Sequence, residues 1–98
     1  MDWDDFPGWG AKISEWAAEY HRTLRDRPVR AQTKPGDIAA QLPVSPPEGP
    51  EGMQAILDDF ERIVMPGMTH WQHPRFFAYF PANAAPPSML AEMLVSTL

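Results

Sequence analysis

The chain of 98 residues contains no cysteine, which excludes a disulfide framework and a thiolate metal site. It has no apolar run near the roughly 20 residues that span a bilayer, and its acidic start, Met1 to Asp5, lacks the basic and apolar regions of a secretory signal. Basic residues are also scarce: 8 lysines and arginines against 13 acids give a formal net charge of −5. A nucleic-acid surface or an anionic membrane surface needs a basic excess. We therefore expect a soluble, cytoplasmic protein with no nucleic-acid or membrane partner.

Proline is abundant, at 12 of 98 residues, yet apolar residues still make up 44% of the chain. Disorder requires low hydrophobicity, so we interpret the prolines as residues that end and separate short helices. A few short helices cannot build a large core. We therefore expect their apolar side chains to be buried against a partner surface.

The first predicted helix covers residues 5–26. Its apolar residues recur at steps of three and four, as on one face of a helix: Phe6, Trp9, Ile13, Trp16, Ala17, Tyr20 and Leu24. Asp5 is the expected N-cap, Pro7 is tolerated in the first turn, and Pro28 ends the helix. We interpret this stripe as core or interface packing.

Two further helices are predicted, one over residues 51–65 and one that opens at Pro86 and reaches the last residue. Between the first two helices we expect an extended stretch over residues 28–36, which closes in a turn at Lys34-Pro35-Gly36. A short helix from Asp37 to Gln41 or Leu42 should follow. A semi-rigid Pro/Gly-rich connector from Pro43 to Gly52 should then lead to the second helix. The predicted fold class is all-α, with three to four short helices joined by Pro-rich connectors. Because the last helix carries no stop signal, we expect it to continue into a longer protein.

The stretch from His70 to Asn83 contains five aromatic residues, two histidines and two prolines within fourteen residues. Large aromatic side chains bury the most area per residue, so this stretch is either an anchor into another surface or the wall of a pocket. On a helix, His70 and His73 would share a face and could begin a zinc site. Pro74 disfavours a helix there, and no third ligand is nearby, so a metal site is not expected.

No other catalytic pattern is present in the sequence. The serines lie in no nucleophile-elbow pattern, and the six glycines form no phosphate-binding loop. We therefore predict no self-contained active site and no catalytic residue within these residues.

The residues from Ile63 to Ala82 read IVMPGMTHWQHPRFFAYFPA. Together with the Pro35-Gly36 turn and the final run from Pro87 to Leu94, they resemble the segment near the N-terminus of the pyridoxal-phosphate-dependent aromatic L-amino acid decarboxylases, the group II decarboxylases. The pieces Thr69-His70-Trp71 and Phe76-Phe77-Ala78-Tyr79-Phe80-Pro81 are the most specific part of the resemblance.

The resemblance implies that residues 1–98 are an N-terminal helical dimerisation segment, the flap of a fold-type I enzyme whose large domain lies outside them. It implies a homodimer, and a lyase that decarboxylates an aromatic L-amino acid to its amine and CO2. Pyridoxal 5'-phosphate is implied as the cofactor of the full-length enzyme but not of this segment alone, because neither Lys12 nor Lys34 lies in the motif of the Schiff-base lysine.

By position, the resemblance also implies a substrate-binding set: Trp71, Tyr79, Phe80, Pro81 and Ala82. Ala82 stands where a threonine is frequent and touches the substrate, so that hydroxyl contact is absent here, and Asn83 is a candidate substitute. The alternative to the whole reading is a stand-alone helical interaction module with no catalysis of its own.

Overall fold

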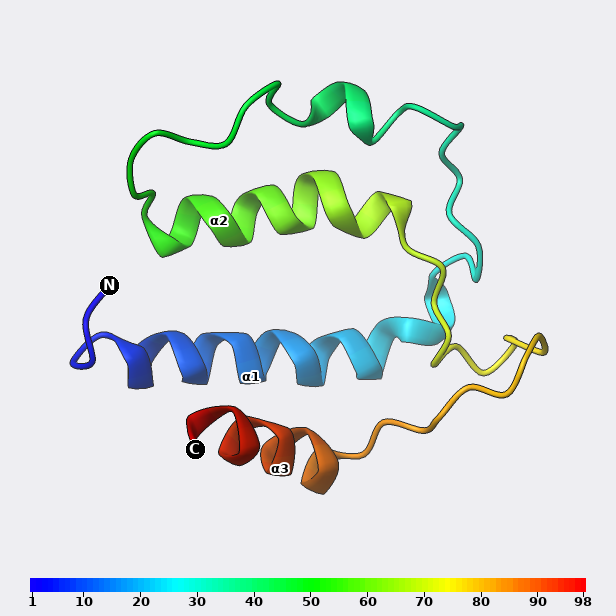
Figure 1. Ribbon diagram of the computed structural model, residues 1–98. Coiled ribbons are helices and arrows are strands. Elements are labelled where there is room, and N and C mark those ends of the chain that lie inside the picture. The colour runs from blue at the N-terminus through cyan, green and yellow to red at the C-terminus, as the bar shows by residue number, and fades with distance from the viewer.

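The computed structural model describes residues 1–98 and contains helices and no strands (Figure 1). The three α-helices are α1 (Phe6–Thr23), α2 (Met53–Asp59) and α3 (Pro86–Thr97). Four short helical pieces accompany them: 3-10 turns at Leu24–Asp26, Ala39–Gln41 and Met65–Gly67, and a π-helical turn at Phe60–Val64. The prediction of an all-α fold with short helices is confirmed. None of the helices combines the length and the apolar character needed to cross a bilayer.

The first helix begins and ends close to the predicted bounds, but its start is not capped as expected. Asp5 occupies the N-cap position without a capping hydrogen bond from its side chain. The turn before the helix is closed by the Asp2 carboxylate, which accepts hydrogen bonds from the backbone N–H groups of Asp4 and Asp5, at 2.9 and 3.2 Å. After the 3-10 turn, Arg27 is extended, as a residue before proline prefers.

The second predicted helix corresponds to α2 and the two helical turns that continue it to Gly67, and we call residues 53–67 the α2 segment. The predicted short helix from Asp37 is smaller than expected, a single 3-10 turn at Ala39–Gln41. The Asp37 carboxylate closes the preceding turn by accepting from the Lys34 backbone N–H at 2.8 Å. Gly36 sits in this turn at φ 92°, a conformation that favours glycine.

The start of α3 agrees with the prediction. Pro86 and Pro87 occupy its first turn, where a missing N–H costs least. The Ser88 hydroxyl accepts from the Ala85 N–H at 3.2 Å and donates to the Ala85 carbonyl at 2.8 Å. These contacts fix the point at which the chain turns into the helix.

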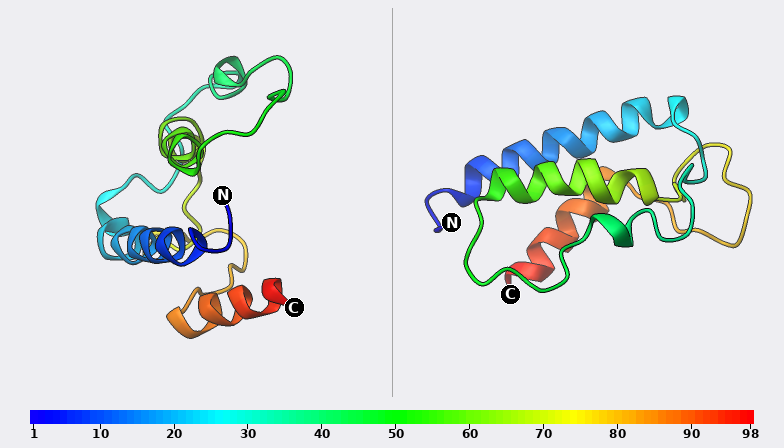
Figure 2. Two further views of the ribbon diagram at one scale, coloured as in Figure 1. Left: turned by 90° about the vertical axis from the view of Figure 1, so that its left-hand side faces the viewer. Right: turned by 90° about the horizontal axis from the view of Figure 1, so that it is seen from above.

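The helices form an open layer. Figures 1 and 2 show α2 on one side of α1 and α3 on the other, and Met93 of α3 comes within 3.8 Å of the position that a Cβ at Gly10 would take. The radius of gyration is 15.7 Å, against about 12.6 Å for a compact domain of this length. The accessible surface is 8252 Å², against about 5,700 Å² for a compact protein of this mass. The helices alone therefore do not enclose a core.

Trp16 connects α1 to the π-helical turn Phe60–Val64 that continues α2. Its ring lies 5.5 Å from that of Tyr20 in a parallel stack and meets the ring of Phe60 edge-on at 5.4 Å. Its indole Nε1–H donates to the Glu61 carboxylate at 2.5 Å. Nearby, the Lys12 ammonium donates to the Gln54 side chain. These contacts join α1 to the α2 segment, although Leu24 and Ile63 are the only buried apolar residues.

Replacing Gly67 with alanine should destabilise the fold. A Cβ at this position would lie 2.9 Å from Cγ1 and 3.1 Å from Cδ1 of Ile38, which packs over the end of the α2 segment. Because Ile38 is half-buried and can shift, we expect a loss of about 1 kcal/mol in the free energy of unfolding, at the low end for overpacking. Thermal unfolding of Gly67→Ala measures it.

Gly49→Ala is the matched control, because nothing lies within 4 Å of its added methyl group. The double variant Ile38→Ala/Gly67→Ala should lose less stability than the sum of its two single variants. Equal melting temperatures for Gly67→Ala and Gly49→Ala would contradict this account of the contact.

Candidate functional site: an aromatic loop fixed by two histidines

The segment from His70 to Ala84, the aromatic loop, connects the α2 segment to α3. Figure 1 shows it as the yellow and orange excursion beyond the ends of the helices. It contains no helix or strand, only turns closed by His73 N–H to His70 O at 3.1 Å and Phe76 N–H to His73 O at 3.0 Å. The expected non-helical path around Pro74 is confirmed.

His70 ties the loop to α1. Its ring Nδ1 lies 2.6 Å from the Tyr20 hydroxyl, its backbone N–H donates to the Val29 carbonyl at 2.9 Å, and its side chain is buried. Burial, and secondarily the charges of Arg27 and His73, lower the pKa of His70 from its usual value. Burial likewise raises the pKa of Tyr20, against the opposing charge of Arg27. The pair is therefore held in its neutral form.

His73 is the second anchor. Its Nδ1 accepts from the Arg75 backbone N–H at 3.0 Å, and its Nε2 lies 2.9 Å from the Arg27 carbonyl. A carbonyl only accepts, so Nε2 must carry the proton. Both ring nitrogens of His73 are occupied by these contacts, and no group of three metal-binding side chains gathers anywhere in the chain. The two histidines are structural anchors.

Trp71 lies between the two anchors in sequence and stacks on two rings of the loop. Its ring is 5.4 Å from Phe76, at an interplanar angle of 20°, and 5.6 Å from Tyr79, at 3°. Tyr79 has φ 56°, left-handed backbone that non-glycine residues hold only where their surroundings enforce it. The stack and the left-handed turn together set the direction of the Tyr79 ring.

The loop presents these rings outward. Trp71 is 49% exposed, Tyr79 78% and Phe80 fully exposed. A contiguous exposed apolar surface of this kind marks an interaction site. The loop therefore offers an aromatic face to a ligand or to another protein surface.

The structure brings together part of the predicted substrate-binding set. Trp71 and Tyr79 are in contact, Phe80 projects into solvent, and Pro81 is half-buried. Ala82 is exposed, and its carbonyl accepts from the Gln72 side chain at 2.5 Å. Sequence reasoning gave Tyr20 only a packing role and assigned no site role to Phe76 or Gln72. The contacts of these three residues span 5 to 50 positions and leave no periodic signal.

Similarity to known proteins gives the class of the molecule. The structure superposes on part of the crystal structure of Rhodiola rosea 4-hydroxyphenylacetaldehyde synthase with a TM-score of 0.90 and 38% sequence identity. The alignment covers 99% of this chain and 21% of the synthase chain. The fold and loop are thus those of a helical segment within a larger enzyme of this type.

The chain belongs to the pyridoxal-dependent decarboxylase family. The family's conserved domain matches residues 35–98. Two relatives are each 40% identical over 98 residues, which is all of this chain: the phenylacetaldehyde synthase of Arabidopsis thaliana and the aromatic-L-amino-acid decarboxylase of Rattus norvegicus. The chain spans about a fifth of the length of these curated relatives, at 20% of each.

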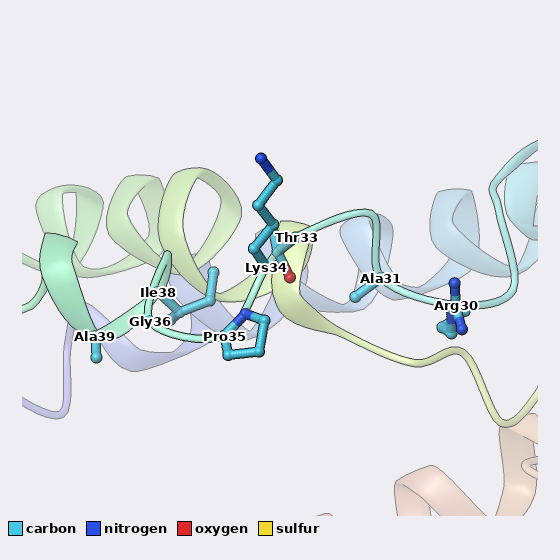
Figure 3. A pocket seen from close by; sticks show the side chains of 8 residues that line it. All are labelled: Arg30, Ala31, Thr33, Lys34, Pro35, Gly36, Ile38 and Ala39. Atoms are coloured by element: carbon cyan, nitrogen blue, oxygen red, sulfur yellow. The ribbon is translucent and has the colours of Figure 1, made fainter.

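The side chains of this segment do not assemble a pyridoxal phosphate site. Lys12 is engaged by Gln54 and lies 5.0 Å over the Trp9 ring. Lys34 lines a shallow depression of about 710 Å³ that has Arg30 at one end and Ala39 at the other, and no carboxylate among its lining residues (Figure 3). A site for this cofactor needs a free lysine for the imine, a partner for the pyridine nitrogen and a place for the phosphate. Lys12 shares a second depression with Asp4 and Asp5, and these carboxylates would repel a phosphate.

Acidification should loosen the anchor of the aromatic loop. The folded state holds the pKa of His70 below its ordinary 6.5, so the unfolded chain binds that proton first. The stabilisation is complete above about pH 6.5 and is lost as the pH falls further. The melting temperature should therefore drop more between pH 7.5 and about 5.5 in the wild type than in His70→Gln.

His21→Gln is the control, because His21 is exposed and makes no hydrogen bond to the loop. It should retain the wild-type dependence on pH. An identical acid sensitivity in His70→Gln and in the wild type would rule out His70 as the group responsible.

Proposed function

We propose that residues 1–98 are the N-terminal helical dimerisation segment of a pyridoxal-phosphate-dependent lyase that decarboxylates an aromatic L-amino acid to its amine and CO2. In this role the segment contacts the rest of the enzyme and the second subunit of a homodimer, and supplies one wall of the substrate pocket. The observation that carries the proposal is the exposed stack of Trp71 and Tyr79, on a loop held by buried His70 and His73, in a chain of the decarboxylase family.

The proposed wall consists of Trp71, Tyr79, Phe80, Pro81 and Ala82. Aromatic rings held in a fixed direction can stack on an aromatic substrate and keep water from it. The names of the relatives support an aromatic substrate, since each refers to an aromatic amino acid or an aromatic aldehyde. Because Ala82 has no hydroxyl, its side chain offers the substrate only a methyl group.

The surface of the segment supports a large partner. Its accessible area exceeds that of a compact protein of equal mass by about 2,500 Å², which is the scale of an obligate interface. On α3, Leu90, Leu94 and Val95 are 61%, 68% and 70% exposed. We propose that these side chains pack on the remainder of the enzyme or on its second subunit, in the cytoplasm, and that residues outside this segment bind pyridoxal 5'-phosphate.

The enzyme that contains this segment should decarboxylate at least one of L-tyrosine, L-dopa, L-tryptophan, L-phenylalanine and L-histidine. Released CO2, amine and aldehyde should all be measured, because two of the similar proteins are named as aldehyde synthases. Aldehyde as the sole organic product would overturn amine formation. A coding sequence that stops directly after Leu98 would favour the stand-alone interaction module.

Tyr79→Ala in that enzyme should impair turnover more than folding. Loss of a stacked, exposed ring removes substrate contact but little core, so we expect kcat/KM to fall about tenfold, equal to about 1.4 kcal/mol. Phe77→Ala is the matched control, an 89% exposed ring of the same loop that takes no part in the stack. Equal kcat/KM for both variants, with every aromatic substrate, would contradict the pocket-wall assignment.

The isolated segment should self-associate through its exposed apolar faces. Light scattering at high concentration measures the mass, and Leu94→Lys should lower it because that side chain is 68% exposed on α3. Ala11→Lys, on an exposed position of α1, is the control. A clean monomer of the unaltered segment would count against the proposed partner surface.

A further inference from the structure

Gln72 makes hydrogen bonds across the aromatic loop with both ends of its side-chain amide. Its Nε2 donates to the Ala82 carbonyl at 2.5 Å, and its Oε1 accepts from the Ala84 backbone N–H at 3.0 Å. These bonds join positions that are 10 and 12 residues apart. We call this pair of bonds the Gln72 clasp.

The backbone that carries the Gln72 side chain is held in place by its neighbours. Gln72 lies directly before His73, which is buried and held by the Arg27 carbonyl and the Arg75 N–H. It directly follows Trp71, the ring on which Phe76 and Tyr79 stack. The side chain therefore connects the anchored limb of the loop to the limb that returns toward α3.

The residues between Gln72 and Ala82 need contacts that hold their backbone in place. Tyr79 holds a left-handed φ of 56°, which a non-glycine residue keeps only where its surroundings over-determine it. Its ring and that of Phe80 are mostly exposed, so burial within this chain does not hold them. The stack on Trp71 and the closure of the loop by Gln72 are the two constraints that the chain itself supplies.

We propose that Gln72 is a positioning residue that closes the aromatic loop and so holds Tyr79 and the Ala82 backbone in the arrangement offered to the substrate. Gln72 does not touch the substrate in this role. The inference rests on the proposed function for its effect on turnover, but the closure of the loop is a property of the chain that can be measured without turnover.

Gln72→Met tests the proposal in the full-length enzyme, because methionine keeps the length of the side chain and loses both hydrogen bonds. Freed from the glutamine oxygen, the Ala84 amide should exchange with deuterium about tenfold faster or more. KM for the aromatic substrate should rise about tenfold while kcat changes less, because the loop must be ordered by binding. The melting temperature should stay near that of the wild type.

The control is Gln32→Met, an exposed glutamine whose only side-chain hydrogen bond is to the Arg30 carbonyl two residues away. A second variant, Gln72→Glu, keeps an acceptor for Ala84 but loses the donor to Ala82 when ionised. Its exchange rate at Ala84 should lie closer to the wild type than that of Gln72→Met. A general loss of stability would not make exchange at Ala84 slower in Gln72→Glu than in Gln72→Met.

Unchanged exchange at Ala84 in Gln72→Met, relative to Gln32→Met, would overturn the clasp. Faster exchange at Ala84 with an unchanged KM would overturn the proposal that Gln72 positions the substrate-pocket wall. If the wild-type enzyme turns over no aromatic amino acid, the proposed function fails, and the exchange rate at Ala84 still decides for or against the clasp.

Discussion

The junction between the end of α1 and the aromatic loop is the constraint on which the rest of the structure depends. Four residues of the chain are buried, and two of them, His70 and His73, belong to this junction. Each histidine is satisfied by partners from α1 or the segment after it: the Tyr20 hydroxyl, the Val29 carbonyl and the Arg27 carbonyl. Buried polar groups are tolerated only when they are paired with defined geometry. This polar junction therefore fixes the root of the loop more tightly than apolar packing in so open a layer could.

This arrangement separates the part that holds the loop from the part that presents it. The histidines and Tyr20 face inward, whereas Trp71, Tyr79 and Phe80 face outward. A loop with a rigid root and exposed rings can meet a surface that completes it without refolding, which lowers the entropy that binding must overcome. On the proposed function, the exposed apolar face of α3 and the large accessible area have the same explanation, which is a partner surface outside the 98 residues.

Sequence reasoning predicted the elements well where the signal was local. The stripe from Phe6 to Leu24 predicted α1, and the two prolines before Ser88 predicted the start of α3. The same reasoning placed the N-cap at Asp5 correctly, but the capping bond expected of its side chain does not form. It overestimated the helix at Asp37, whose carboxylate closes the preceding turn. In both places, only the path of the backbone decides which N–H group a carboxylate can reach.

The sequence by itself determined the helices, the breaks between them and, through its motif from Ile63 to Ala82, the family. These features follow from neighbours within a few residues, where propensity, spacing and proline geometry act directly. Only the tertiary structure decided that Tyr20 holds His70, that Trp71 stacks on Tyr79 and that Gln72 closes the loop onto Ala82 and Ala84. Those contacts join residues that are 8 to 50 positions apart, and such pairs are selected by the packing of the whole chain, which no local pattern encodes.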